Sequence, residues 1–187
     1  MVDKIIVDAD LCIKLGGSNK YRFLYVLPMI SKEIYMHTHA HGEVMMPASA
    51  VGQLKDLISE GRVILVNESG LDSKVRATYD AAYNNLAKVM VDPTRSNKNK
   101  GEMCSLAYAK ATGIPVFATD EKDLQPIIDK QLNTGMDDIT CIRIVVIILK
   151  AKEGEITVPR KIAKALWGVA GKRKEIFDNE IWPVTID

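Results

Sequence analysis

The sequence predicts a three-layer α/β/α fold, in which helices cover both faces of a mainly parallel central sheet. Two observations lead to this prediction. Short apolar runs suited to buried strands recur along the chain, and longer segments with apolar residues at helical spacing separate them. The chain has 187 residues, of which 47% are apolar and 26% are charged, so its length and composition fit one globular domain.

Turn and cap residues set the limits of the predicted elements in the first half of the chain. Pro28 marks a kink or a helix boundary, Ser49 can cap a helix, and Gly61 can end it. Asp92 and Pro93 stop the helix that follows. The predicted elements are a strand at 4–8, helices at 21–37 and 49–60, a strand at 62–66, and a helix at 71–90.

The second half begins with a polar, basic loop at 94–101, which leads into a helix that ends at Gly113. Residues 145–152 fit a strand or a helix equally well, and Pro159 suits the first turn of a last long helix. The other predicted elements are a helix at 102–113, a strand at 114–118, a helix at 121–132, a strand at 140–144 and an extended end at 182–184.

Charge and cysteine content narrow the setting in which the protein works. The chain has 25 Lys and Arg against 24 acids, so any basic footprint for nucleic acid must be local. Cys12, Cys104 and Cys141 lack the spacing of a disulfide framework or a zinc cluster, which favours a reducing cytoplasm. No secretory signal opens the chain, and its longest apolar stretch, Cys141–Leu149, is about half the length of a membrane span. We therefore expect no membrane partner.

Acidic residues follow closely after two of the predicted strands. Asp8 and Asp10 follow the first, Asp120 follows the strand at 114–118, and Asp123 comes one helical turn later on the same face. Glu102 lies in the first turn of its own helix. Any one of these acids could be a helix cap, but together they can converge, because the carboxyl ends of parallel strands line the crevice of an open sheet. Clustered carboxylates need a neutralising cation, and Mg²⁺ and Mn²⁺ prefer oxygen ligands, so a metal-dependent reaction on phosphate is the leading hypothesis.

Three short motifs surround these acids. They are Ile-Ile-Val-Asp8, then Lys100-Gly101-Glu102 at the start of an alanine-rich helix, and Thr119-Asp120-Glu-Lys-Asp123 after Ile-Pro-Val-Phe-Ala. In this order they resemble the PIN-domain family of metal-dependent ribonucleases. The similarity covers residues 4 to about 144 and implies a PIN-like core there. The remaining residues, about 145–187, would form a C-terminal helical extension of the same domain, 1–187.

The resemblance implies an active site as well as a fold. By it, Asp8, Glu102, Asp120 and Asp123 would be the catalytic residues and would hold one or two Mg²⁺ or Mn²⁺ ions. Thr119 would hydrogen-bond to a water on the metal or to the substrate phosphate. The implied reaction is hydrolysis of a phosphodiester in single-stranded RNA, in which a water activated by the metal attacks the phosphorus and no protein nucleophile is needed.

One position departs from the family pattern. Gln53 stands where the family usually has another glutamate, and because an amide cannot supply negative charge, metal affinity or activity should be lower. Basic residues also precede Glu102. Lys98 and Lys100, with Arg95, are candidates for guiding the phosphate backbone, and a solvated loop explains them equally well.

Other partners remain open at this stage. Large apolar side chains between Tyr21 and Ile34 suit a homodimer or a protein partner wherever they stay exposed. Many members of the resembled family are toxins that a small protein inhibits, although this chain is longer than those. The C-terminal extension could pack on the core, form a dimer surface or bind substrate. Its basic side chains, Arg160, Lys161 and Lys164, fit a surface helix or a nucleic-acid contact.

Two other functions compete with the nuclease hypothesis. The first is a PIN-like module without turnover that binds RNA or protein, which the Gln53 departure supports. The second is a phosphatase similar to the haloacid dehalogenases, since Asp8-Ala-Asp10 follows a strand. In that reading Asp8 is the nucleophile, Asp10 is the general acid and base, and Asp137 and Asp138 bind the metal.

The three histidines of the chain lie within five residues. His37, His39 and His41 would share a face of an extended segment and could bind Zn²⁺ or Ni²⁺. No cysteine or fourth ligand lies nearby in the sequence, so we expect a solvated loop instead.

Overall fold

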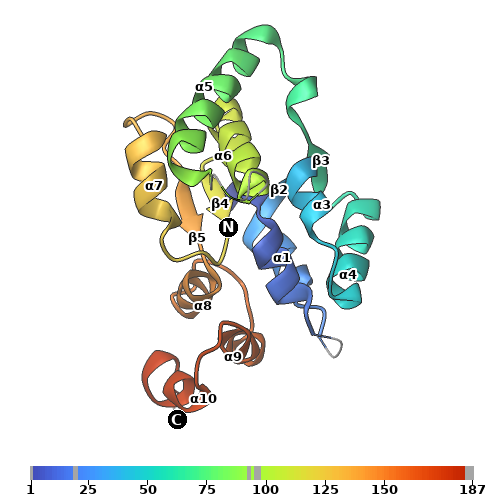
Figure 1. Ribbon diagram of the computed structural model, residues 1–187. Helices are drawn as coiled ribbons and strands as arrows, with labels where there is room; N and C mark the ends of the chain where they lie inside the picture. Colours follow the sequence, from blue (N-terminus) through green and yellow to red (C-terminus); the bar gives the residue numbers. More distant parts are fainter. Residues whose placement is uncertain (1, 19–20, 92–93, 95–97, 184–187) are drawn as a thin grey trace.

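A parallel sheet of five strands forms the centre of the protein (Figure 1). The computed structural model describes residues 2–18, 21–91, 94 and 98–183. Over these residues the strand order is β3-β2-β1-β4-β5 and every neighbouring pair is parallel, which confirms the predicted α/β fold. The strands are β1 (Val2–Val7), β2 (Ser31–His37), β3 (Ile64–Val66), β4 (Val116–Ala118) and β5 (Thr140–Ile142).

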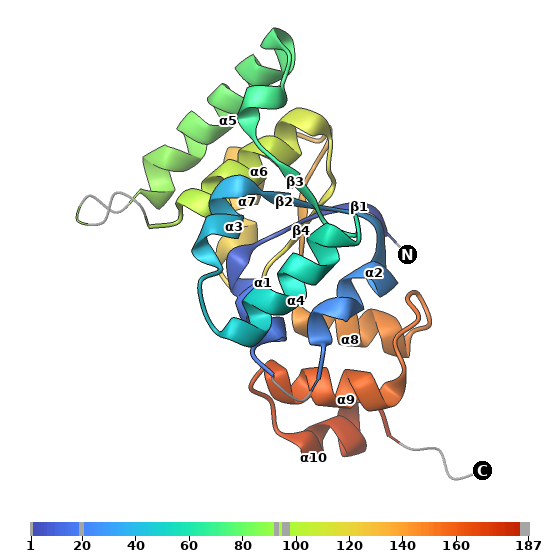
Figure 2. The same ribbon diagram turned by 90° about the vertical axis from the view of Figure 1, so that its right-hand side faces the viewer.

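Helices cover both faces of this sheet (Figure 2). The alternation of β1 separates the two layers, because Ile5 and Val7 pack into one apolar cluster and Ile6 packs into the other. The first cluster is completed by α1 (Ala9–Gly16), α2 (Leu27–Ile30), α4 (Ala48–Ser59), α8 (Ile144–Lys152) and α9 (Arg160–Val169). The second is completed by α5 (Ser73–Met90), α6 (Lys100–Thr112) and α7 (Leu124–Gln131), while α3 (Thr38–Glu43) follows β2 at the carboxyl edge.

The prediction of a helix over 21–37 was wrong for the second half of that segment. A 3₁₀ turn, η1 (Phe23–Val26), and the short α2 come first, and Pro28 lies in the first turn of α2. Strand β2 then begins at Ser31 and pairs with β1. Its side chains alternate, with Ile34 and Met36 buried on one face and Tyr35 on the other, which fits a strand covered on both sides. Pairing with the central strand outweighs the helical spacing of the apolar residues.

The C-terminal extension packs on the first cluster. Residues 145–152, which fitted either element, belong to helix α8, and Ile147 and Ile148 of that helix are fully buried. The last helix is shorter than predicted, since α9 ends at Val169, and α10 (Lys174–Ile176) and a π-helical turn, η3 (Phe177–Ile181), follow. Phe177 is buried against Trp167. Of the three roles open for the extension, packing on the core is the one observed.

The described residues contain neither a membrane-spanning helix nor a disulfide. No helix in this part of the chain is long and apolar enough to cross a membrane. The three cysteines all belong to it, and none forms a disulfide.

Candidate metal centre

The carboxyl ends of β1 and β4 bring two predicted site residues together. Val7 is paired with Ala118, and the backbone N–H of Asp8 donates to the Ala118 carbonyl at 2.9 Å. Asp8 and Thr119 are therefore neighbours, although they are 111 positions apart in the sequence. This edge of the sheet is where ligands bind in open parallel folds.

Asp8 is almost completely buried, with 1% of its surface exposed. Its Oδ2 accepts a hydrogen bond from the Thr119 hydroxyl at 3.4 Å, whereas its Oδ1 is buried without a hydrogen-bond partner in the described part of the chain. Burial, with smaller contributions from the charges of Asp10 and Glu43, raises the pKa of Asp8 to about 7. A buried oxygen without a partner costs stability until a proton or a cation satisfies it.

Thr119 makes a positioning contact. It is fully buried, and besides donating to Asp8 its hydroxyl accepts a hydrogen bond from the backbone N–H of Glu121 at 3.2 Å. The residue therefore holds Asp8 and fixes the turn after β4. Thr119 is not exposed to a substrate phosphate in this arrangement, and its contact with a water on the metal, the other role that the resemblance implies, stays a prediction.

Asp120 and Asp123 lie in the bend between β4 and α7. Because α7 begins at Leu124, these acids do not share a helix face, contrary to the prediction. The side chain of Asp120 is 8% exposed, its Oδ2 forms an ion pair with the Lys14 ammonium, and its Oδ1 is buried without a described partner. Asp123 is exposed and lies on the rim of the site. Asp120 is thus the second acid with a buried oxygen to satisfy.

Glu102 lies in the first turn of α6, as predicted, and is half-buried. Burial raises its pKa to about 8, with further contributions from the charges of Asp8, Glu121 and Asp10. Since these charges all act on Glu102, the acids of the two strand ends and of α6 occupy one region of the molecule.

Glu43 is an acid of this region that the sequence analysis missed. Its Oε1 accepts a hydrogen bond from the Gly101 N–H at 3.0 Å, at the amino terminus of α6. A Cβ added at residue 101 would lie 2.6 Å from Oε2 of Glu43, so the glycine makes room for the carboxylate. The Lys100-Gly101-Glu102 motif carried this signal, but Glu43 lies just beyond β2, the strand that was predicted as a helix.

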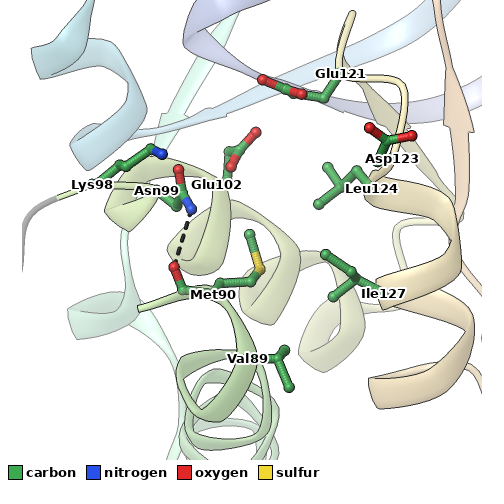
Figure 3. A pocket seen from close by; sticks show the side chains of 9 residues that line it. All are labelled: Val89, Met90, Lys98, Asn99, Glu102, Glu121, Asp123, Leu124 and Ile127. Carbon is green, nitrogen blue, oxygen red and sulfur yellow. Dashed lines mark hydrogen bonds between the residues drawn. The ribbon is translucent and has the colours of Figure 1, made fainter. Parts of the chain in front are cut away.

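A groove of three adjoining cavities runs along this edge, and Glu121 lines all three. The first cavity is lined by five acids and by Lys98 and Asn99. The acids are Asp8, Asp10, Glu43, Glu102 and Glu121. Figure 3 shows the second cavity. Its polar end is formed by Glu102, Glu121, Asp123, Lys98 and Asn99. Its apolar end is formed by Val89, Met90, Leu124 and Ile127. The third cavity lies between α1 and the bend after β4.

Gln53 is not part of this groove. Its Nε2 donates to the Gly16 carbonyl at 3.3 Å, and its Oε1 accepts from the Leu24 N–H at 3.3 Å. The buried amide therefore ties the end of α1 to η1, away from the acids. Of the predicted basic residues, Lys98 lines the groove, Lys100 does not, and Arg95 lies outside the described residues.

The histidines do not form the solvated loop that the sequence suggested. His37 ends β2 and is fully buried, and its Nε2 lies 3.2 Å from Oε2 of Glu68. Its Nδ1 accepts a hydrogen bond from the His39 N–H at 3.2 Å, and the two rings stack. Burial lowers the pKa of His37. These contacts cap α3 and pack its start against the sheet.

Asp137 and Asp138, the metal pair of the phosphatase hypothesis, precede β5. All strands are parallel, so these acids lie at the edge of the sheet opposite Asp8. Asp138 instead accepts hydrogen bonds from two backbone N–H groups of its own turn, those of Thr134 and Gly135. This placement does not fit a site shared with Asp8.

The donor chemistry of the groove suits a hard divalent cation. Its candidate ligands are carboxylate oxygens, and Oδ1 of Asp8 and Oδ1 of Asp120 are both buried without a described partner. As the described side chains stand, no three of His, Cys, Asp or Glu form a group ready to hold a metal ion. Binding would therefore require side chains to move, and a cation at Asp120 would meet the charge of Lys14.

Comparison with known proteins adds no further constraint. A scan of the chain against protein-family models gave no match, and a search of curated proteins found no significant match. The resemblance to the PIN-domain family therefore stays a prediction.

Proposed function

We propose that the protein is a metal-dependent ribonuclease that hydrolyses phosphodiester bonds of single-stranded RNA. Asp8, Glu102, Asp120 and Asp123 would bind Mg²⁺ or Mn²⁺, and Glu43 would join them. The observation that supports this best is the pair of buried, unpartnered oxygens on Asp8 and Asp120, within the part of the chain described. Burial, with smaller contributions from neighbouring carboxylates, raises the pKa of Asp8 to about 7 and that of Glu102 to about 8, and a bound cation would offset both effects.

The fold gives these residues distinct tasks. Asp8 and Asp120 follow adjacent strands and are the rigid members of the set, with Asp8 held by Thr119. Glu102 and Glu43 meet at the start of α6. When bound, Mg²⁺ or Mn²⁺ would activate water and offset the charge that develops on the phosphate. Lys98, exposed beside Glu102, would attract the phosphate backbone.

The second cavity favours an unpaired strand over a duplex. Its apolar end, formed by α5 and α7, adjoins the acids directly (Figure 3). An unpaired base can place its apolar face in such a cavity, whereas a base within a duplex is stacked and paired. RNA as substrate and three cysteines outside disulfides also fit a reducing cytoplasm.

Cleavage of end-labelled single-stranded RNA tests the proposal. The native protein should cut in Mn²⁺ or Mg²⁺ and not in EDTA, and Asp8→Asn and Asp120→Asn should lose the activity. Asp137→Asn is the matched control, because it removes an acid at the opposite edge of the sheet. It should cleave at the native rate.

Two other results would support the competing functions. A well-folded native protein that binds RNA but cuts none with either metal would be a binding module. Release of phosphate from p-nitrophenyl phosphate, lost in Asp10→Asn and Asp137→Asn, would favour the phosphatase and overturn the ribonuclease assignment.

A further inference from the structure

Lys14 supplies the countercharge of a buried acid. It projects from α1 toward the bend after β4, and its ammonium pairs with Oδ2 of Asp120. The two partners differ in burial, since the Asp120 side chain is 8% exposed and that of Lys14 is 44% exposed. The second oxygen of Asp120 is buried and has no described partner. Because a buried carboxylate is unfavourable without a positive partner, Lys14 accounts for the stability of Asp120 in the metal-free protein.

The ion pair between Lys14 and Asp120 can separate without moving Lys14 out of the groove. Lysine carries its charge on a flexible stem, and the side chain of Lys14 is partly exposed to solvent. Asp10 lies four residues before Lys14, on the same face of α1, and both line the third cavity with Asp120. The ammonium can therefore leave Asp120 and remain inside the groove.

A divalent cation and Lys14 would compete for one carboxylate. A cation on the unpartnered Oδ1 would lie close to the Lys14 ammonium, which holds Oδ2 of the same carboxylate, and the two positive charges would repel each other. We propose that Lys14 is a displaceable counter-ion, which holds Asp120 in the metal-free site and shifts within the groove toward Asp10 when a metal takes the carboxylate. This inference rests on the proposed metal-dependent function.

Mn²⁺ affinity measured by titration calorimetry on the full chain tests the competition directly. Lys14→Met removes the competitor and should bind Mn²⁺ about fivefold more tightly, the upper range for a partly exposed ion pair. Lys122→Met is the matched control, because Lys122 is exposed and lines the same cavity. It should change the affinity less than about twofold, through the general field alone. Lys14→Arg should bind Mn²⁺ more weakly than the native protein, because arginine can hold a carboxylate with two hydrogen bonds.

Thermal unfolding separates this role from a structural one. In EDTA, Lys14→Met should unfold at a lower temperature than the native protein, since Asp120 loses its partner. In saturating Mn²⁺ the difference should close, because the metal replaces the lysine. A structural lysine would leave the same deficit in both conditions.

These measurements distinguish failure of the metal site from failure of the counter-ion role of Lys14. If the native protein binds no Mn²⁺, the metal site and the proposed function fail together with the inference. If it binds Mn²⁺ but Lys14→Met and Lys122→Met shift the affinity equally, the counter-ion role is wrong and the metal site stands. Should Lys14→Met not fold, the weaker binding expected of Lys14→Arg still decides the matter.

Discussion

Asp8 and Asp178 both meet residues from distant parts of the chain, but their surroundings are opposite. Asp178 lies in η3, where Oδ1 accepts from Nη2 of Arg160 at 2.7 Å and Oδ2 pairs with Lys164. The Lys164 and Arg160 contacts hold the pKa of Asp178 below its ordinary range. Asp8 forms no ion pair with a described residue, one of its oxygens has no described partner, and its pKa is raised to about 7.

The comparison contrasts an acid whose contacts stabilise the fold with acids that we propose bind a cation. Arg160 also donates to the Trp182 carbonyl at 2.9 and 2.6 Å, so the cluster around Asp178 fastens the end of the chain to α9. The polar groups of that cluster satisfy one another. Asp8 and Asp120 each keep a buried oxygen for which the described part of the chain offers no hydrogen-bond partner. Such perturbed groups gather at functional sites, where a bound ligand offsets their cost.

Asp8→Asn should have the largest effect and should separate activity from stability. RNA cleavage should fall at least about 100-fold, because a metal ligand loses its charge. In EDTA at pH 8 the variant should be more stable than the native protein by about 1–3 kcal/mol, since a neutral amide replaces a carboxylate that burial disfavours. Cleavage rates and urea unfolding measure the two effects. Lower stability of the variant at pH 8 would show that Asp8 stabilises the fold, as Asp178 does.

The pH dependence of stability should have opposite signs for the two acids. The pKa of Asp8 rises from 3.8 to about 7 on folding, so between these values the folded protein keeps a proton that the unfolded chain releases. The free energy of unfolding in EDTA therefore falls as the pH rises through this range, and Glu102 extends the fall to about pH 8. Asp178 has a lowered pKa, so its contribution is present above its ordinary value of 3.8 and is lost in more acidic solution.

Urea unfolding of the native protein, Asp8→Asn and Asp178→Asn from pH 3 to pH 8 checks these signs. The fall in the free energy of unfolding toward neutral pH should be shallower in Asp8→Asn than in the native protein. The loss of stability in acid should be smaller in Asp178→Asn. His37, whose pKa is lowered by burial, acts in the opposite sense to Asp8 near neutral pH, and taking the difference from the native protein cancels it. Saturating Mn²⁺ should remove the Asp8 slope, because the metal displaces the protons. If the free energy of unfolding depends on pH in the same way in the native protein and in Asp8→Asn, Asp8 does not have a raised pKa in the folded state.

Much of the fold and part of this site could be predicted from local sequence patterns. Apolar runs that end in acids located β1 and β4, and parallel pairing then placed Asp8 beside the residues that follow β4. Glu102 was found for the same reason, since the helix start at Lys100-Gly101 is a local signal. The ion pairs around Asp178 were not predicted, because they join residues of α9 to a turn whose position depends on packing.

The missed parts of the site depend on tertiary contacts. Strand β2 was read as helix because Leu24, Leu27 and Ile30 before it keep helical spacing, and only pairing with β1 makes the following residues a strand. Losing β2 also hid Glu43, which follows it at the same edge of the sheet. The Lys14–Asp120 pair joins positions 106 apart, which no local pattern relates.

Gly101→Ala should weaken metal binding by about tenfold, a smaller effect than removing a ligand. The added methyl group would lie 2.6 Å from Oε2 of Glu43, so this carboxylate must leave the start of α6. Gly52→Ala in α4 is the control, because nothing lies within 4 Å of its added methyl group. Mn²⁺ titration of both variants is the measurement. Equal affinity in Gly101→Ala and the native protein would place Glu43 outside the metal site.

Gln53→Glu should have the smallest effect on metal binding, although it restores the glutamate that the family pattern suggests. Gln53 bonds to Gly16, eight residues along α1 from Asp8, or roughly 12 Å at the helical rise. At this distance residue 53 cannot bind the cation, and burial disfavours a charged carboxylate there, so Mn²⁺ affinity should change less than about twofold. The new carboxylate would instead face the Gly16 carbonyl and lose a hydrogen bond, which should cost about 1–3 kcal/mol of stability. Titration calorimetry measures the Mn²⁺ affinity, and urea unfolding measures the loss of stability. Gln53→Met is the control, because it should lose a similar amount of stability without adding charge. A clear gain in Mn²⁺ affinity or in RNA cleavage would mean that residue 53 reaches the acids in solution, and that Gln53 belongs with Asp8 and not with the structural contacts of the fold.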